Sequence, residues 1–202
     1  MMPLPQSWYL RDAAQVAREL LGTHICRGRV VLRVTEVEAY LGPDDSACHT
    51  SRGRTARNAP MWGPGGHAYI YLCYGMHNML NVVTGDGDGA AVLIRSCEVV
   101  RGLPLVLQRR GAQQGPGLLA GPGKVGQALD LSTALSGHAL FTRGGLTLHW
   151  GTPATCILAG RRVGIDYAQP RDRNALLRFA DADSSAVTRR RELGSLSRGP
   201  AA

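Results

Sequence analysis

Residues 30–40 read VVLRVTEVEAY, and this stretch decides the fold class. Its β-branched and apolar residues favour an extended strand, in which successive side chains point to opposite faces of a sheet. Glu36, Glu38 and Tyr40 then share one face. We therefore expect a long strand that carries two carboxylates and a phenol side by side.

The sequence around this strand predicts one α+β domain. Asp12 and Gln15 form a capping-box pattern before an amphipathic helix, which Gly22 ends. A GDGDG turn at residues 85–89 precedes an apolar strand over residues 90–96. The other expected elements are a hairpin with strands at 67–74 and 79–84, a helix over 124–131, a hairpin over 139–150 that turns at Gly144-Gly145, and strands within 156–165.

The end of the chain differs in composition from the rest. From residue 181 to residue 202 the sequence is polar and aperiodic, which is typical of a segment that cannot bury enough apolar surface to fold. We expect a domain over residues 1–180 and a disordered tail over residues 181–202.

Composition excludes several classes of protein. The chain has 202 residues, 44% of them hydrophobic and 19% charged, and no uninterrupted apolar run reaches the length of a membrane span. The first residues show no secretory signal pattern. Five scattered cysteines without a Cys-x-x-Cys motif indicate neither a disulfide framework nor a zinc site. We expect an intracellular protein without a structural zinc site.

The charge points to a polyanionic partner. The formal net charge is +8, and all but one of the 23 basic residues are arginine. Residues 101–202 hold 14 basic and 6 acidic side chains, so the positive excess lies in the second half. Arginine favours bidentate contact with phosphate, although a basic solvated surface is the alternative interpretation.

Tyrosines cluster in the middle of the chain. Four of the six tyrosines are Tyr40, Tyr69, Tyr71 and Tyr74, and histidines and a tryptophan accompany them. Tyr69 is expected to pack in the core. A core more often uses Phe or Leu than a phenol, which must find a hydrogen-bond partner. Tyr74 stands where the hairpin turns, so we expect it at an exposed tip.

Several blocks, in this order, closely resemble the alkyladenine (3-methyladenine) DNA glycosylases over roughly residues 8–180. These blocks are EVEAYLGPDD at 36–45 with His49 behind it, Arg57-Asn58, MWGPGGHAYIYLCYGM at 61–76, Asn81, GDG at 87–89, VLIR at 92–95, GPGKVGQAL at 121–129 and RVGI at 162–165. The chain departs from the family pattern by one additional residue between Asn81 and Arg95. The resemblance implies a single mixed domain around a curved antiparallel sheet with a protruding β-hairpin, acting as a monomer without a metal or a cofactor. It also implies a protein that is located in the cytoplasm and associated with the nucleoid if the host is a bacterium.

The resemblance also implies roles for individual residues. Glu38 would activate a water molecule, and Arg95 would hold that water and the carboxylate. Tyr74 would fill the gap that a flipped base leaves in double-stranded DNA. The residues of the base pocket would be Tyr40, His49 and Tyr71, which stack around the damaged purine, and Asn81, which excludes the guanine amino group.

Other mechanisms and functions remain open at this point. A lyase that nicks the strand needs an amine nucleophile, and Lys124 is the single lysine. Its place in a Gly-Pro-Gly loop before a helix favours phosphate contact instead. The alternative functions are a nucleic-acid-binding protein without catalysis and a metal-dependent hydrolase. The first would not require Glu38 or Arg95, and the second would leave the basic excess unused.

Overall fold

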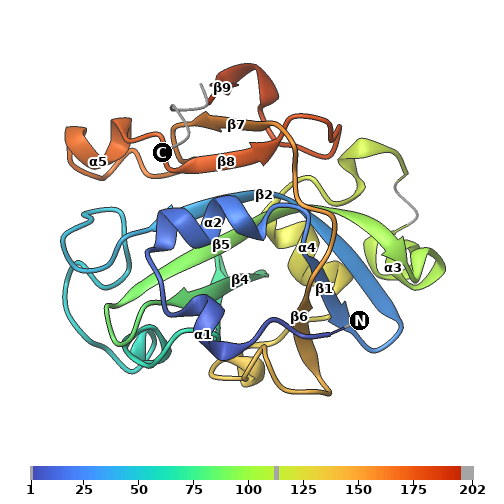
Figure 1. Ribbon diagram of the computed structural model, residues 1–202, viewed down its shortest axis with the longest axis horizontal. Helices are drawn as coiled ribbons and strands as arrows, with labels where there is room; N and C mark the ends of the chain where they lie inside the picture. Colours follow the sequence, from blue (N-terminus) through green and yellow to red (C-terminus); the bar gives the residue numbers. More distant parts are fainter. Residues whose placement is uncertain (1, 112–113, 197–202) are drawn as a thin grey trace.

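The computed structural model describes residues 2–111 and 114–196, and within them nine strands form one antiparallel sheet (Figure 1). The strand order is β3-β4-β5-β2-β8-β7-β9, and β1 pairs with both β2 and β6. The strands are β1 (His24–Arg27), β2 (Val30–Tyr40), β3 (Ala68–Cys73), β4 (His77–Thr84), β5 (Ala90–Arg101), β6 (Leu146–His149), β7 (Ile157–Gly160), β8 (Arg178–Asp181) and β9 (Gly194–Ser195). The α+β class with an antiparallel sheet is confirmed.

Strand β2 lies at the centre of this sheet. It pairs with β5 along most of its length, with β8 over Glu36, Val37 and Glu38, and with β1 at its start. The register with β5 shifts on both sides of Glu36, which is the signature of a β-bulge. The Glu36 and Glu38 side chains are fully buried.

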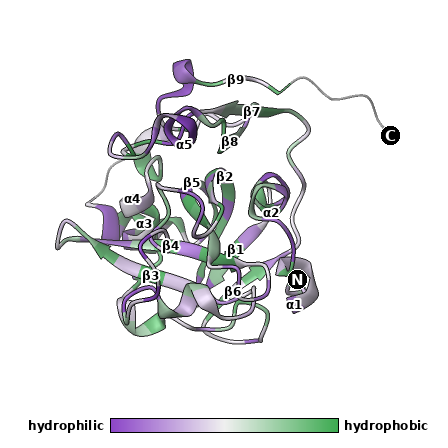
Figure 2. Ribbon diagram, turned by 90° about the vertical axis from the view of Figure 1, so that its left-hand side faces the viewer, coloured by the Kyte–Doolittle hydropathy of each residue, from purple (hydrophilic) through white to green (hydrophobic). Residues whose placement is uncertain are grey.

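Short helices surround the sheet: α1 (Gln6–Tyr9), α2 (Ala13–Leu20), α3 (Leu103–Arg110), α4 (Pro122–Ala128) and α5 (Pro170–Asn174). The backbone N–H of Gln15 donates to the Asp12 side chain at 2.9 Å, so the predicted cap of α2 is confirmed. Val16 and Leu20 of α2 join Val125 of α4 in the main apolar core. Figure 2 shows hydrophobic residues along the inner strands, whereas α5 and the segment before β9 are hydrophilic.

The β3–β4 hairpin separates two apolar clusters. Ala68 and Ile70 belong to the main core, whereas Tyr69 lies in a smaller cluster with Met61 and Val83. This alternation follows from the period of two along a strand. The smaller cluster packs against Tyr40 and Tyr71, so it supports the side of the sheet on which the tyrosines gather.

Two predicted elements need correction. The hairpin expected over 139–150 forms only its second strand, β6, which pairs with β1. A backbone hydrogen bond, from the Leu148 N–H to the Leu140 carbonyl at 3.0 Å, also joins β6 to the residues before it. The apolar side chains Leu146 and Leu148 are fully buried, and the main core takes them up. Helix α3 was not predicted, and β5 continues five residues past the expected end at residue 96.

The disordered tail expected over residues 181–202 is wrong for residues 181–196. Asp181 ends β8, Ser184 and Ala186 are buried, and β9 pairs with β7. Few apolar side chains hold this segment, and for that reason its polar composition wrongly predicted disorder. Polar contacts to buried carboxylates hold it instead, as described below. Residues 197–202 lie outside the described part of the chain.

In the part of the chain that the structure describes, no helix combines the length and the apolar character that crossing a membrane requires. All five cysteines are free thiols.

Candidate active site

A cavity of about 570 Å³ opens beside the centre of the sheet. Four strands contribute to its lining: β2 with Tyr40, β3 with Tyr71, β4 with Asn81 and β5 with Arg95. The loop after β2 adds His49, and the loop after β7 adds residues 163–165 and Tyr167. Tyr74, which directly follows β3, also lines it, so the structure brings six of the predicted site residues to one cavity.

Glu38 lies directly behind the wall of this cavity. Its carboxylate accepts a hydrogen bond from the Tyr40 hydroxyl at 3.0 Å, on Oε2. Its Oε1 accepts one from the backbone N–H of Val163 at 2.7 Å and contacts Arg95 Nη1 at 3.1 Å. Tyr40, Val163 and Arg95 all line the cavity, so the carboxylate is one side chain away from its contents.

Arg95 joins two buried carboxylates. Besides its contact with Glu38, its Nε donates to Glu36 Oε1 at 3.0 Å. Burial lowers the pKa of Arg95, but the charges of Glu38 and Glu36 outweigh that effect and the net shift is upward. The guanidinium is therefore a fixed positive charge at the cavity. The one additional residue between Asn81 and Arg95, relative to the family pattern, has not moved Arg95 away from Glu38.

The segment after β8 secures this arrangement. The backbone N–H and the hydroxyl of Thr188 donate to Glu36 at 2.8 and 2.6 Å, and Arg95 Nη2 donates to the same hydroxyl at 3.2 Å. Ser96 donates to Glu36 at 2.6 Å. Sequence reasoning missed Glu36 and Thr188, although the position of Glu36 on the same strand face as Glu38 was a usable signal.

Aromatic rings form the walls of the cavity. The His49 ring lies 4.6 Å from the Tyr71 ring, edge to face, and His49 Nδ1 is 2.9 Å from the Tyr69 hydroxyl. Burial, helped by the charge of Arg57, lowers the pKa of His49, so this ring is neutral at pH 7. Burial also raises the pKa values of the Tyr40 and Tyr71 phenols, which therefore stay protonated.

Asn81 stands on β4 opposite Tyr69 of β3 and is buried at the cavity. Its side-chain nitrogen donates to the backbone carbonyl of Tyr69 at 3.0 Å, which holds the amide in one orientation. A fixed amide can discriminate between hydrogen-bond donors and acceptors on a ligand.

Tyr74 occupies the tip of the β3–β4 hairpin with 88% of its surface exposed. Tyr74 and Gly75 have φ values of 51° and 70°, and the N–H of Met76 donates to the carbonyl of Cys73 at 3.1 Å. These are the features of a type I′ turn, in which Asn-Gly is the preferred pair. A bulky residue with positive φ is strained, so the turn does not account for a tyrosine at this position.

The phosphate-contact candidate Lys124 is half-buried in α4, and its ammonium donates to the carbonyl of Gly117 at 2.7 Å. Pro122 of the same helix lines the cavity. Two other basic residues, Arg162 and Arg178, are fully buried in ion pairs with Asp45 and Glu36, so part of the positive excess after residue 100 is not available to a partner.

Arg57 and Tyr167 also line the cavity without having been singled out as site residues. The Arg57 guanidinium lies 5.2 Å from the centre of the Tyr71 ring. The Tyr167 hydroxyl donates to the carbonyl of Ala47 at 3.0 Å. Among residues 2–111 and 114–196, no group of three or more His, Cys, Asp and Glu side chains is placed to hold a metal ion.

Comparison with known proteins gives consistent matches over nearly the whole chain. The model of a family described as methylpurine-DNA glycosylase (MPG) matches residues 7–185. A DNA-3-methyladenine glycosylase of Arabidopsis thaliana is 54% identical over 191 residues, which cover 93% of this chain and 75% of that protein. A protein of Nitrosococcus oceani, named as a proposed 3-methyladenine DNA glycosylase, is 53% identical over 191 residues, which cover 94% of this chain and 95% of the other.

Proposed function

Because this chain belongs to the methylpurine-DNA glycosylase family, we propose that it removes alkylated or deaminated purines from duplex DNA in base excision repair. In this proposal it hydrolyses the bond between the damaged base and its sugar, and leaves the DNA strand intact. Because its substrate would be genomic DNA, the proposal also locates the enzyme inside the cell, at the nucleoid if the host is a bacterium.

The first step of the proposal is base flipping. A base within a duplex must leave the stack before its sugar bond can be attacked, which costs a few kcal/mol. The exposed Tyr74 ring at the hairpin tip is suited to fill the vacated space. Tyr40, His49 and Tyr71 offer aromatic surfaces to the extruded purine, and stacking of this kind contributes about 1 to 3 kcal/mol per base.

The second step is hydrolysis. Departure of the base leaves positive charge on the sugar, which a nearby carboxylate stabilises. In this proposal Glu38 is that carboxylate, and it also takes the proton of an attacking water molecule. Within the described part of the chain, Glu38 Oε2 accepts one hydrogen bond, from Tyr40, and so retains a lone pair for that water. Arg95 and the N–H of Val163 hold the carboxylate in place.

One observation carries the proposal: Tyr40 both lines the cavity and donates its hydroxyl proton in a hydrogen bond to Glu38. A base that stacks on this ring therefore has its sugar next to the carboxylate. In the same proposal Asn81 acts at the pocket as the filter against the guanine amino group. Lys124 is a phosphate contact, and its hydrogen bond to Gly117 argues against an amine nucleophile.

The test is incubation of the protein with methylated duplex DNA, followed by chromatography of the released bases. We expect free 3-methyladenine and 7-methylguanine, no base release from unmethylated DNA, and strands that break only after alkali treatment. Binding without release would favour a non-catalytic nucleic-acid-binding protein. Loss of release in the presence of a chelator would favour a metal-dependent hydrolase.

A further inference from the structure

The Tyr40 ring has a buried guanidinium on the side away from the cavity. The central carbon of the Arg162 guanidinium lies 4.8 Å from the ring centre, and the Arg162 side chain is fully buried. Tyr40 lines the cavity, whereas Arg162 does not. The ring therefore lies between a permanent positive charge and the space in which a purine would stack.

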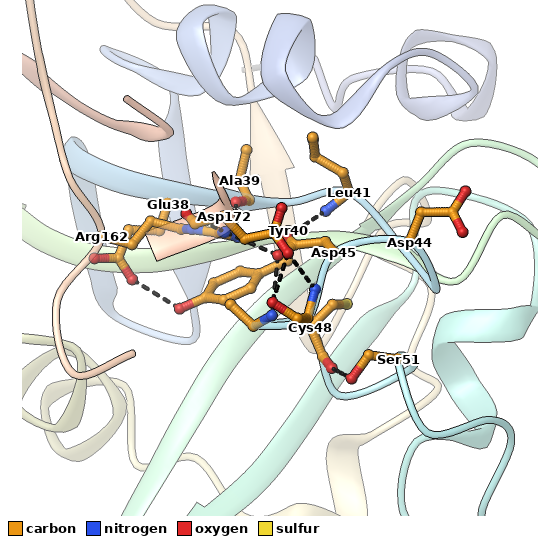
Figure 3. Close-up of polar contacts among 12 residues, drawn as sticks. Glu38, Ala39, Tyr40, Leu41, Asp44, Asp45, Cys48, Ser51, Arg162 and Asp172 are labelled. Carbon is orange, nitrogen blue, oxygen red and sulfur yellow. Dashed lines mark hydrogen bonds and ion pairs between the residues drawn. The ribbon is translucent and has the colours of Figure 1, made fainter. Parts of the chain in front are cut away.

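Asp45 neutralises this charge. Both terminal nitrogens of Arg162 donate to the two carboxylate oxygens of Asp45, which is the bidentate arrangement that best matches a guanidinium. The same nitrogens donate to the backbone carbonyls of Ala39 at 3.0 Å and Asp172 at 3.2 Å. Asp45 in turn accepts from the N–H groups of Leu41 and Ala47 at 3.1 and 3.0 Å, so both partners are held rigidly (Figure 3).

Stability alone is a weak reason to bury such a pair, because well-packed apolar residues of similar volume often stabilise a protein as well or better. The position of the pair suggests an electrostatic reason. The face of an aromatic ring attracts cations, and purines alkylated at N3 or N7 are cationic, whereas hypoxanthine is neutral. An uncompensated guanidinium behind the ring would compete for that attraction and would repel a cationic base.

We propose that the Asp45–Arg162 pair sets the preference of the enzyme for cationic over neutral purines. Arg162 packs against Tyr40 and holds it in place, and Asp45 cancels the guanidinium charge so that the open face of the ring still favours a cationic base. This inference rests on the proposed glycosylase function and concerns the choice among its substrates. Neither residue touches the reacting bond, so both are positioning residues.

The experiment measures single-turnover release of 7-methylguanine and of hypoxanthine from otherwise identical duplexes, and compares the ratio of the two rates. Since both rates come from one preparation, the fraction of active protein cancels. The variants are Asp45→Asn, Arg162→Met and the double substitution. The matched control is Asp172→Asn, because the Asp172 carboxylate binds Ser46 and Arg171. The backbone carbonyl of Asp172, which accepts from Arg162, is kept in this variant.

The two single substitutions should move the ratio in opposite directions. Asp45→Asn exposes the guanidinium charge and should lower the preference for 7-methylguanine by about two- to thirty-fold, the range that cation–π attraction covers. Arg162→Met leaves the Asp45 carboxylate charge without its cationic partner and should raise the preference for 7-methylguanine. The double variant should return to within about twofold of the unmodified protein, and Asp172→Asn should leave the ratio unchanged.

Loss of purely structural support would slow both substrates equally in every variant, and this result would overturn the inference. If Asp45→Asn does not fold, the other two variants still decide. The ratio of 7-methylguanine release to hypoxanthine release must rise in Arg162→Met and return toward that of the unmodified protein in the double variant. If the unmodified protein releases neither base, the proposed function fails, and that failure is distinct from an unchanged ratio.

Discussion

At the scale of single residues, Tyr74 shows a conflict between local stability and the proposed use of the side chain. Its φ of 51° suits Asn or Gly, and a bulky residue in this conformation costs on the order of 1 kcal/mol or more. The ring recovers little of that cost by packing, because it is 88% exposed. Such a residue is best explained by a partner that it meets outside the protein.

Replacing Tyr74 should therefore separate stability from activity. Tyr74→Asn should raise the free energy of unfolding slightly, by up to about 1 kcal/mol, because Asn-Gly is the preferred type I′ pair. The same variant should lose at least about tenfold more release rate on a well-paired lesion than on one opposite a mismatch, since a wedge matters most in a stable stack. Urea unfolding and single-turnover assays measure the two effects. Equal losses on both duplexes would make Tyr74 a packing residue.

His49 allows a prediction about pH. A cationic base leaves without protonation, so its release should rise with pH to a plateau as Glu38 loses its proton. Neutral hypoxanthine must gain a proton as it leaves, so its profile should be bell-shaped. Burial lowers the pKa of His49 from its ordinary value of 6.5. A His49 acid would therefore lose its proton as the pH rises through a value below 6.5. We expect the basic limb of the hypoxanthine profile to lie at a higher pH than this, and to remain in the His49→Gln variant.

Rates from pH 5 to 9 for both substrates check this expectation. Disappearance of the basic limb in His49→Gln would make His49 the acid. A bell for the cationic substrate and a plateau for the neutral one would contradict the assignment of a lone general base to Glu38.

At the scale of the elements, the sequence predicted the parts that carry the cavity. The period of two in β2 placed Glu36, Glu38 and Tyr40 on one face, and the bond between Tyr40 and Glu38 agrees with it. The β3–β4 hairpin was predicted because its turn contains glycine between two apolar runs. Such local patterns are visible in sequence because neighbouring residues produce them.

The elements that were missed depend on distant partners. Strand β6 pairs with β1, more than a hundred residues away, so the nearby Gly144-Gly145 turn was a misleading signal. The segment 181–196 is held by contacts such as Thr188 to Glu36 and Ser184 to Glu98, across β2 and β5. Polar composition cannot show such contacts, because it does not tell which buried group will receive the hydrogen bond.

Thr188→Val tests whether this segment holds the two carboxylates and Arg95 together. Valine keeps the shape of threonine but removes the hydroxyl that donates to Glu36 and accepts from Arg95. Hydrogen bonds to charged groups contribute about 1.5 to 3 kcal/mol, and we expect a loss of this size in the free energy of unfolding. The control is Ser185→Ala, at an exposed position of the same segment. Equal stability of the two variants would show that the segment contributes little to the arrangement.

At the scale of the whole molecule, the charge of +8 is divided between two uses. Arg162 and Arg178 hold buried carboxylates, whereas Arg52, Arg54 and Arg161 are exposed in loops that contribute residues to the cavity. Of the positive excess after residue 100, only the exposed arginines, such as Arg161, are therefore available for phosphate contact. The buried ones should affect folding and not the salt dependence of binding.

Salt dependence of duplex binding measures the first of these uses. The logarithm of the affinity should fall linearly with the logarithm of the salt concentration, and the slope should become shallower by about 0.9 for each phosphate contact removed. We expect this change for Arg54→Gln and Arg161→Gln. The control is Arg29→Gln, in the turn before β2, because β2 spans roughly 35 Å between that turn and the loop that carries Arg54. An affinity that does not change with salt would contradict nucleic-acid binding altogether.

The central claim is that Glu38 activates the water that releases the base, and Glu38→Gln tests it most directly. The amide keeps the shape but cannot take a proton, and Glu36 still pairs with Arg95. Base release from methylated duplex DNA under single-turnover conditions, together with binding of the same duplex, is the measurement. We predict a loss of about 10² to 10⁴ in the release rate with binding within a few-fold of the unmodified protein. Equal losses of binding and release, or release that persists, would contradict the account.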